Sequence, residues 1–205
     1  MKIICISGKA RHGKDTTAGL LKEYLELADK KVLVTHYADL LKYLCKTYFG
    51  WDGNKDENGR QLLQYVGTDI IRKKRPDFWV DFVADILELF NDTWDYVIIC
   101  DTRFPNEVSR LKDRGFDVIH LRVKRTEFDN NLTEEQRNHP SETALDDITP
   151  DYCIINDTTL DDLRYKTVEF LAEYMVTSSI SDVFKNLIKY INGKISFNDI
   201  WGDTN

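Results

Sequence analysis

Residues 3–17, IICISGKARHGKDTT, decide the fold class of this chain. The stretch opens with four apolar residues, which predict a buried strand, and continues into a glycine-containing loop and the start of a helix. From Gly8 to Lys14 the loop has the spacing Gly-x-x-x-x-Gly-Lys. In a strand–loop–helix setting this spacing is typical of a loop that binds nucleotide phosphates with its backbone N–H groups. We therefore predict a binding site for ATP at the end of the first strand.

Several residues of this loop and of the helix that follows are candidate ATP ligands. Gly8 and Gly13 allow a tight turn, and the helix N-terminus adds a partial positive charge. Lys14 is expected to reach the β- and γ-phosphates. The remaining candidates carry guanidinium, carboxylate or hydroxyl groups, and they are Arg11, Asp15, Thr16 and Thr17.

Asp15 departs from the usual form of the motif. A Ser or Thr normally follows the lysine, and its hydroxyl contacts Mg²⁺. Asp15 has two interpretations: it ligates Mg²⁺ directly or through water, or it is a first-turn acid that the helix dipole favours.

Four further apolar runs predict strands at residues 32–37, 96–100, 118–123 and 152–155. Because the runs alternate with segments of helical periodicity, we expect an α/β fold with a five-stranded parallel sheet. Several runs are almost continuously apolar, which is typical of strands covered by helices on both faces.

The long intervals between strands predict two excursions from the sheet. An insert is expected over about 38–92, and a charged lid over about 124–150. Together with the sheet they would form one domain, residues 1–176. Residues 177–205 would follow as a helical extension that packs on its own domain or across a homodimer interface. The expected helices of the insert cover 38–48, 59–74 and 78–91.

The composition argues against several classes of partner and location. The net charge of −7 disfavours polymeric nucleic acid as a partner, because binding a phosphate backbone requires a basic surface. No run approaches the roughly 18 apolar residues of a membrane helix, and the apolar run near the N-terminus is too short for a signal peptide. The four cysteines lack Cys-x-x-Cys spacing, which disfavours zinc and disulfide bonds. These features predict a soluble, cytoplasmic protein.

A second group of polar residues follows the third predicted strand. Asp101 would lie at the carboxyl edge of the sheet, where it could face Mg²⁺, or it could cap the helix that begins near Pro105. Arg103 could hold a phosphate with its two-pronged guanidinium group. Both are candidate catalytic residues.

Over about residues 1–175 the chain resembles the bacteriophage-type deoxynucleoside monophosphate kinases. The animal phosphomevalonate kinases share a related loop with Asp after its lysine. The segments that carry the resemblance are 8–17 (GKARHGKDTT), 38–42 (ADLLK), 66–69 (VGTD) with Arg72, 76–80 (PDFWV), 101–107 (DTRFPNE), 139–142 (HPSE) and 155–157 (IND).

This resemblance implies a P-loop NTPase three-layer fold, with a helical acceptor-binding insert and an arginine-bearing lid. It implies transfer of phosphate from ATP, with Mg²⁺, to a deoxynucleoside monophosphate, an activity of the EC 2.7.4 type. The enzyme would act in the cytoplasm, or in the host cytoplasm if it comes from a phage. The acceptor site would consist of Asp39, Lys42, Arg72, Trp79 and Arg103.

The lid offers positive charge for the transition state of phosphoryl transfer. Its candidates include Arg122 and His139, but Arg125 and Arg137 are the preferred catalytic residues. Asn156 follows the fifth strand, where its amide either reads the edge of the adenine or forms a turn.

Other functions remain open at this point. A related kinase could phosphorylate phosphomevalonate or dephospho-coenzyme A, since fold alone does not decide the acceptor. A base-stacking wall would favour a nucleotide, and its candidate aromatic residues are Trp79, Tyr37, Tyr43 and Tyr65. A GTP-dependent switch is disfavoured, because residues 54–57 (NKDE) end in Glu where that class requires Asp. The alternative of a non-catalytic nucleotide-binding protein is supported only by Asp15, which stands where catalytic members of this class carry a hydroxyl.

Overall fold

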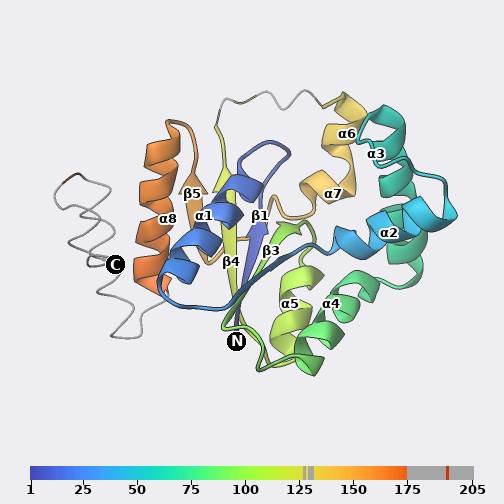
Figure 1. Ribbon diagram of the computed structural model, residues 1–205. Coiled ribbons are helices and arrows are strands. Elements are labelled where there is room, and N and C mark those ends of the chain that lie inside the picture. Colours follow the sequence, from blue (N-terminus) through green and yellow to red (C-terminus); the bar gives the residue numbers. More distant parts are fainter. Residues whose placement is uncertain (127, 129–131, 175–192, 194–205) are drawn as a thin grey trace.

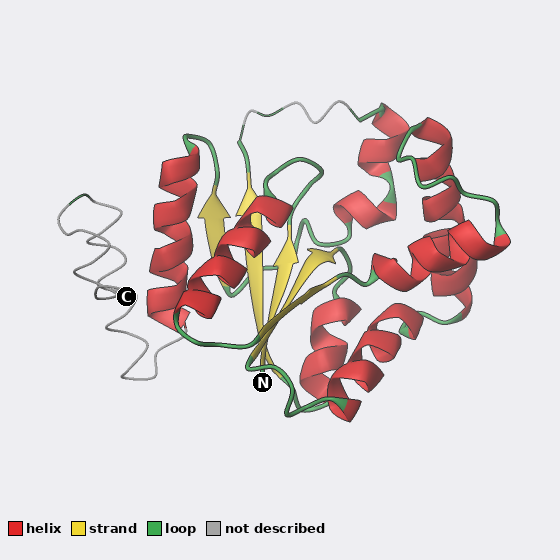
Figure 2. Ribbon diagram, viewed as in Figure 1, coloured by secondary structure: helices red, strands yellow, loops and turns green. Residues whose placement is uncertain are grey.

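The computed structural model of the chain describes residues 1–126, 128, 132–174 and 193. Its centre is a five-stranded parallel sheet with the order β2-β3-β1-β4-β5. The five predicted strands are confirmed, and their carboxyl ends meet at one edge of the sheet (Figure 2). The strands are β1 (Lys2–Ser7), β2 (Val32–Thr35), β3 (Tyr96–Thr102), β4 (Asp117–Lys124) and β5 (Tyr152–Ile155).

Helices cover both faces of the sheet and make it the middle of three layers (Figure 1). The main covering helices are α1 (Lys14–Leu27) and α8 (Leu160–Tyr174) on one face, and α4 (Phe78–Leu89) and α5 (Asn106–Asp113) on the other. Side chains of β1 alternate between the two cores. Ile4 and Ile6 pack with α1 and α8, whereas Ile3 and Cys5 pack with α4 and α5. The architecture is the predicted P-loop NTPase fold.

The helices between β2 and β3 differ from the prediction at one place. They are α2 (Ala38–Tyr48), α3 (Glu57–Gln64), a π-helix η1 (Tyr65–Arg72) and α4. The helix expected over 59–74 is confirmed as one uninterrupted helical stretch, but its residues 65–72 are wound as a π-helix. The Gly67 carbonyl accepts a hydrogen bond from Trp79 Nε1 at 3.0 Å, and a Cβ at Gly67 would lie 2.6 Å from Leu41 Cδ2. Close packing of α2 and α4 against this backbone accounts for the change in helix geometry.

Two short helices, α6 (Glu134–Asn138) and α7 (Pro140–Thr143), lie within the predicted lid. Thr133 and Gln136 form a capping box on α6, and the His139 side chain caps α7. The predicted extension over 177–205 lies outside the described residues except for Gly193. In the described part of the chain, no helix is both long enough and apolar enough to span a membrane.

Candidate active site

The loop that joins β1 to α1 depends on its two glycines. Gly8 and Gly13 have φ angles of 148° and 100°, and Arg11 between them has a φ of 63°. A Cβ at Gly8 would lie 2.2 Å from the Val123 carbonyl oxygen, and one at Gly13 would lie 2.4 Å from Asn156 Nδ2. Side chains at either position would therefore push the loop away from the sheet edge.

Lys14 spans the loop from its first helical position. Its Nζ donates hydrogen bonds to the carbonyls of Gly8 at 2.7 Å and Lys9 at 2.9 Å. Burial lowers the pKa of Lys14 to about 8, and the nearby positive charge of Arg103 acts in the same direction. The loop thus gathers positive charge in a partly buried place, which favours binding of an anion.

Asn156 lies beneath the loop, and only 5% of it is exposed. Its Nδ2 donates to the His12 carbonyl at 3.0 Å, and its backbone N–H donates to the Lys124 carbonyl at 2.8 Å. The side-chain N–H₂ group therefore supports the loop instead of facing a base. Its expected role of reading the adenine edge has no counterpart in this arrangement.

The two threonines of α1 lie in different environments. Thr16 is exposed, whereas Thr17 is completely buried, and its Oγ1 has no hydrogen-bond partner among the described residues. The helical rotation between neighbouring residues turns Thr17 toward the core. The prediction that the Thr17 hydroxyl contacts a phosphate is therefore wrong, because the side chain lies in the core.

Two cavities flank the loop at the carboxyl edge of the sheet. The insert-side cavity, between the loop and the insert helices, has a volume of about 420 Å³, and Arg11 and Asp15 line it. The lid-side cavity, between the end of β4 and the lid, has a volume of about 720 Å³. Both volumes are typical of small-molecule sites. The cavities share Arg103, Leu132, Ser141 and Glu142, so they meet where α7 contacts the segment after β3.

Asp101 lines the insert-side cavity and holds the start of α2. Its Oδ1 accepts the Tyr37 N–H at 2.9 Å, and its Oδ2 accepts the Ala38 N–H at 3.0 Å. The alternative prediction was that Asp101 caps the helix that begins near Pro105. The structure shows instead that Asp101 caps α2. Each carboxylate oxygen retains a second acceptor position.

A buried ion pair organises the arginines of the insert-side cavity. Glu107 Oε1 accepts from Arg72 Nη2 at 2.5 Å, and Oε2 accepts the backbone N–H groups of Arg103 at 2.7 Å and Phe104 at 3.1 Å. The side chains of Arg72 and Glu107 are only 12% and 3% exposed. Burial raises the pKa of Glu107, whereas the Arg72 charge and the N–H donors act in the opposite direction.

Sequence reasoning assigned no role to Glu107. The sequence pattern could have indicated that Glu107 is buried. It lies on α5 one turn before the buried Leu111, on a helix face that otherwise packs into the core. A carboxylate there needs partners, because burying an unpaired charge is costly.

Asp39 and Lys42 form an ion pair on the first turns of α2. Lys42 Nζ donates to Asp39 Oδ1 at 2.8 Å, and His36 Nδ1 lies 3.3 Å from Asp39 Oδ2. Burial opposes ionisation of Asp39, but the Lys42 hydrogen bond and His36 outweigh it, so the pKa of Asp39 is lowered. Lys42 itself lines the insert-side cavity.

The aromatic residues considered for a stacking wall do not lie together. Trp79 and Tyr37 are buried and line the insert-side cavity. Tyr43 and Tyr65 are 60% and 57% exposed and do not line it. The four-residue wall is therefore corrected to Trp79 and Tyr37, and the Tyr37 hydroxyl is already bonded to the Glu107 carbonyl at 2.6 Å.

The lid helix α7 lies against the phosphate-binding loop. The Glu142 carboxylate forms an ion pair with Arg103 and accepts the Ala10 N–H at 3.4 Å. Lys9 Nζ donates to the Glu142 carbonyl at 2.6 Å and pairs with the Asp146 carboxylate, also at 2.6 Å. A carboxylate therefore occupies a loop N–H group and an arginine that could otherwise bind a phosphate.

Arg125 and Arg137 both line the lid-side cavity. Arg125 Nε donates to the Asn156 carbonyl at 3.0 Å, and its guanidinium group lies 4.8 Å from the centre of the Phe128 ring. Arg137 Nε donates to the Leu132 carbonyl at 3.0 Å. Arg125 reaches this cavity from the start of the lid, and Arg137 reaches it from α6.

Arg122 has a different environment from the other lid arginines. Its Nη2 donates to the carbonyls of Leu145 at 2.7 Å and Ile148 at 2.8 Å. These bonds tie the returning end of the lid to β4, which is a structural role.

The sequence model of the family described as deoxynucleotide monophosphate kinase matches residues 33–167. The deoxynucleotide monophosphate kinase of Enterobacteria phage T4 is 34% identical over 109 residues, which cover 52% of this chain and 42% of that protein. A protein of Acanthamoeba polyphaga mimivirus, to which the same name is given provisionally, is 26% identical over 189 residues, covering 79% of this chain and 92% of that protein.

Among solved structures, the APS kinase CysC of Mycobacterium tuberculosis aligns with a TM-score of 0.47 and 13% identity, covering 83% of this chain and 96% of that chain. The chain spans less than half the length of the phage T4 relative. The family model, in contrast, matches well over half of the 205 residues. The chain therefore belongs to the deoxynucleotide monophosphate kinase family.

Proposed function

We propose that this chain transfers the γ-phosphate of ATP to deoxynucleoside monophosphates and releases the diphosphates, an activity of the EC 2.7.4 type. The observation that carries the proposal is the meeting of two cavities at Arg103, beside the phosphate-binding loop. Two ligands can therefore present their phosphates to each other across one arginine. The family supports a deoxynucleotide acceptor.

ATP is assigned to the loop and the lid-side cavity. Its phosphates would replace the carbonyl partners of Lys14, and they would accept N–H groups between Gly8 and Gly13, with Arg11 beside them. The larger volume, about 720 Å³, suits the rest of the nucleotide. Arg125 would face it from the end of β4.

The monophosphate is assigned to the insert-side cavity. Arg72 and Lys42 offer positive charge to its phosphate, and Asp39 orients Lys42. Trp79 and Phe104, which both line this cavity, provide apolar surface for the base. Arg103 completes the site from the sheet edge.

In the reaction, an oxygen of the acceptor phosphate attacks the γ-phosphorus in line with the bond to the leaving oxygen. The new phosphorus–oxygen bond forms as the bond to the β–γ bridging oxygen breaks, and ADP leaves. The chain contributes positioning and charge, since the transferred group carries its negative charge on the equatorial oxygens. Lys14 and Arg103 stabilise that charge from the loop side, and Arg137 does so from the lid.

The donor set also suits Mg²⁺. Asp15 and Asp101 both line the insert-side cavity and present carboxylate oxygens, the ligands that Mg²⁺ prefers. Mg²⁺, when bound, would neutralise charge on the β- and γ-phosphates. We assign Asp15 as a direct or water-mediated ligand, and Asp101 as a ligand that also holds α2.

ADP release in the presence of each deoxynucleoside monophosphate tests the proposal. We expect turnover with at least one of them, and none in Lys14→Ala. Phosphomevalonate and dephospho-coenzyme A serve as alternative acceptors, and turnover with one of these alone would overturn the assigned acceptor. We place the enzyme in the cytoplasm, or in the host cytoplasm for a phage protein.

A further inference from the structure

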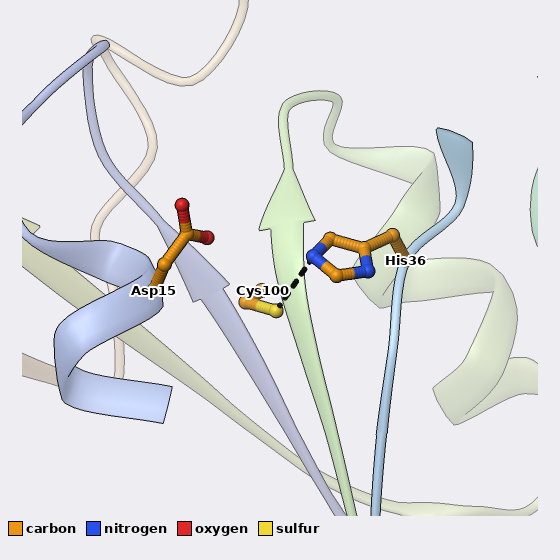
Figure 3. Close-up of side chains that lie close together, drawn as sticks. All are labelled: Asp15, His36 and Cys100. Atoms are coloured by element: carbon orange, nitrogen blue, oxygen red, sulfur yellow. Dashed lines mark hydrogen bonds between the residues drawn. The ribbon is translucent and has the colours of Figure 1, made fainter. Parts of the chain in front are cut away.

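Three side chains with metal-binding atoms face one another in the insert-side cavity (Figure 3). Asp15 comes from the first turn of α1, His36 from the segment before α2, and Cys100 from β3. One ligand atom of each lies within 4.8 Å of the other two, and His36 Nε2 is 3.2 Å from Cys100 Sγ. We propose that these residues form a binding site for a divalent cation of the zinc class.

The donor atoms determine the class of cation. Zinc binds thiolate sulfur at about 2.3 Å and imidazole nitrogen at about 2.0 Å, usually with tetrahedral geometry. These bond lengths place sulfur and nitrogen about 3.5 Å apart. The observed separation of His36 Nε2 and Cys100 Sγ is close to this value. Mg²⁺ prefers six oxygen ligands, so the sulfur and nitrogen donors favour a cation of the zinc class, and the site shares Asp15 with the proposed magnesium site.

The imidazole ring is already oriented for metal binding. His36 Nδ1 faces Asp39 Oδ2 at 3.3 Å, and Lys42 holds the other Asp39 oxygen at 2.8 Å. Histidine ligands of metals usually donate their second ring N–H to a carboxylate, which fixes the ring and its tautomer. With the proton on Nδ1, the Nε2 lone pair points toward Cys100 (Figure 3).

Carboxylates lie beside the donor atoms. Asp101 follows Cys100 on β3, and the Asp39 carboxylate contacts His36. Their negative charge offsets that of the lysines and arginines that also line the cavity, and it attracts a divalent cation. When the cation binds, a metal–sulfur bond replaces the S–H bond, and the proton passes to solvent.

The position of the site gives it a consequence for the cavity. Asp15, His36 and Cys100 all line the insert-side cavity, so the open fourth position of a tetrahedral cation would face the space assigned to the acceptor. Binding of the cation does not rest on the proposed kinase activity. If that activity holds, the cation competes with the acceptor for space and with Mg²⁺ for Asp15.

Titration of the full chain with Cd²⁺, in excess Mg²⁺ and without nucleotide, tests the site. Cd²⁺ is a spectroscopic substitute for zinc, because a cadmium–thiolate bond absorbs in the ultraviolet. We expect one equivalent to bind with this absorption, and Zn²⁺ to displace it. Cys100→Ser should abolish the absorption, and His36→Asn should weaken the affinity at least tenfold. Asp39→Asn should weaken it about tenfold by releasing the ring.

The exposed Cys153 provides the matched control, because Cys153→Ser removes a thiol outside the site. Its titration should equal that of the original chain. Unchanged absorption in Cys100→Ser, loss of absorption in Cys153→Ser, or no thiolate absorption in the original chain would each overturn the proposal. Circular dichroism of each variant checks folding. If Cys100→Ser is unfolded, the loss of affinity in His36→Asn still tests the site, because His36 is partly exposed and its substitution leaves the core intact. Absence of kinase turnover would leave this result untouched.

Discussion

The two sides of the active site hold their arginines in different ways. On the insert side, Arg72 and Glu107 are almost fully buried, and Glu107 also fixes the backbone at Arg103. On the lid side, the Arg103 side chain is 32% exposed and is paired with Glu142, which comes from a helix of four residues. The first pair joins the insert to the segment after β3, and the second joins that segment to the lid.

Under the proposed function, this difference prepares charge for the two ligands in two ways. A buried pair keeps its geometry, because separating it would leave an uncompensated charge. The Arg103 side chain is accessible enough for a phosphate to replace its carboxylate, and Glu142, which is only 8% exposed, would keep the Ala10 N–H as a partner. The insert side is therefore preorganised, and the lid side is exchangeable. Four experiments test this contrast, and they follow in order of decreasing effect.

Removing Arg103 should have the largest effect, because its side chain reaches both cavities. In Arg103→Ala we expect kcat to fall by about a thousandfold, since this charge acts on the transition state. Steady-state ADP release measures the change. Arg103→Lys should recover part of the rate by restoring the charge. A rate within tenfold of the original in Arg103→Ala would remove Arg103 from the site.

Breaking the buried pair should affect stability more than breaking an exposed one. In Glu107→Gln we expect the free energy of unfolding to fall by about 3 kcal/mol, because Arg72 keeps its charge in a buried place. Urea unfolding measures the loss, and the acceptor KM should rise as Arg72 moves. The control is Glu88→Gln, which breaks an exposed pair with Arg114 and should cost no more than about 1 kcal/mol. Equal losses would contradict the contrast.

The depressed pKa of Lys14 predicts a pH dependence of ATP binding. Below about pH 8 Lys14 is charged, so the affinity should be constant there with respect to this group. Above about pH 8 the free protein must take up a proton to bind phosphate, and the affinity should fall by up to about tenfold per pH unit. Isothermal titration from pH 7 to pH 9.5 measures this. Lys14→Arg should bind without the fall, because arginine stays charged.

Freeing Arg103 from the lid should give the smallest effect. In Glu142→Gln we expect the dissociation constant of ATP to fall about fivefold, because phosphate no longer competes with a carboxylate for Arg103 and the Ala10 N–H. The matched control is Glu135→Gln, an exposed lid residue, which should leave the constant unchanged. Weaker ATP binding in Glu142→Gln would show that the carboxylate supports the site and does not compete for it.

Local sequence placed several predicted site residues at the two cavities, and their roles stay predictions. Arg72 and Lys14 line the insert-side cavity, and Arg103 lines both. The Thr17 hydroxyl was predicted to contact a phosphate. One step along the helix from Thr16 turns the side chain from the surface to the core, so Thr17 is buried. Asn156 supports the loop, and only the approach of β5 to Gly13 reveals this.

By itself, the sequence determined the sheet and the phosphate-binding loop. Apolar runs and the spacing from Gly8 to Lys14 act over a few residues, so they can be read without knowing the fold. Only the tertiary structure decided which distant side chains meet. The order β2-β3-β1 brings the start of α2, the end of β3 and the start of α1 together. Cysteine spacing argued against zinc, yet that juxtaposition places Asp15, His36 and Cys100 around one point, because ligand sites depend on distance in space.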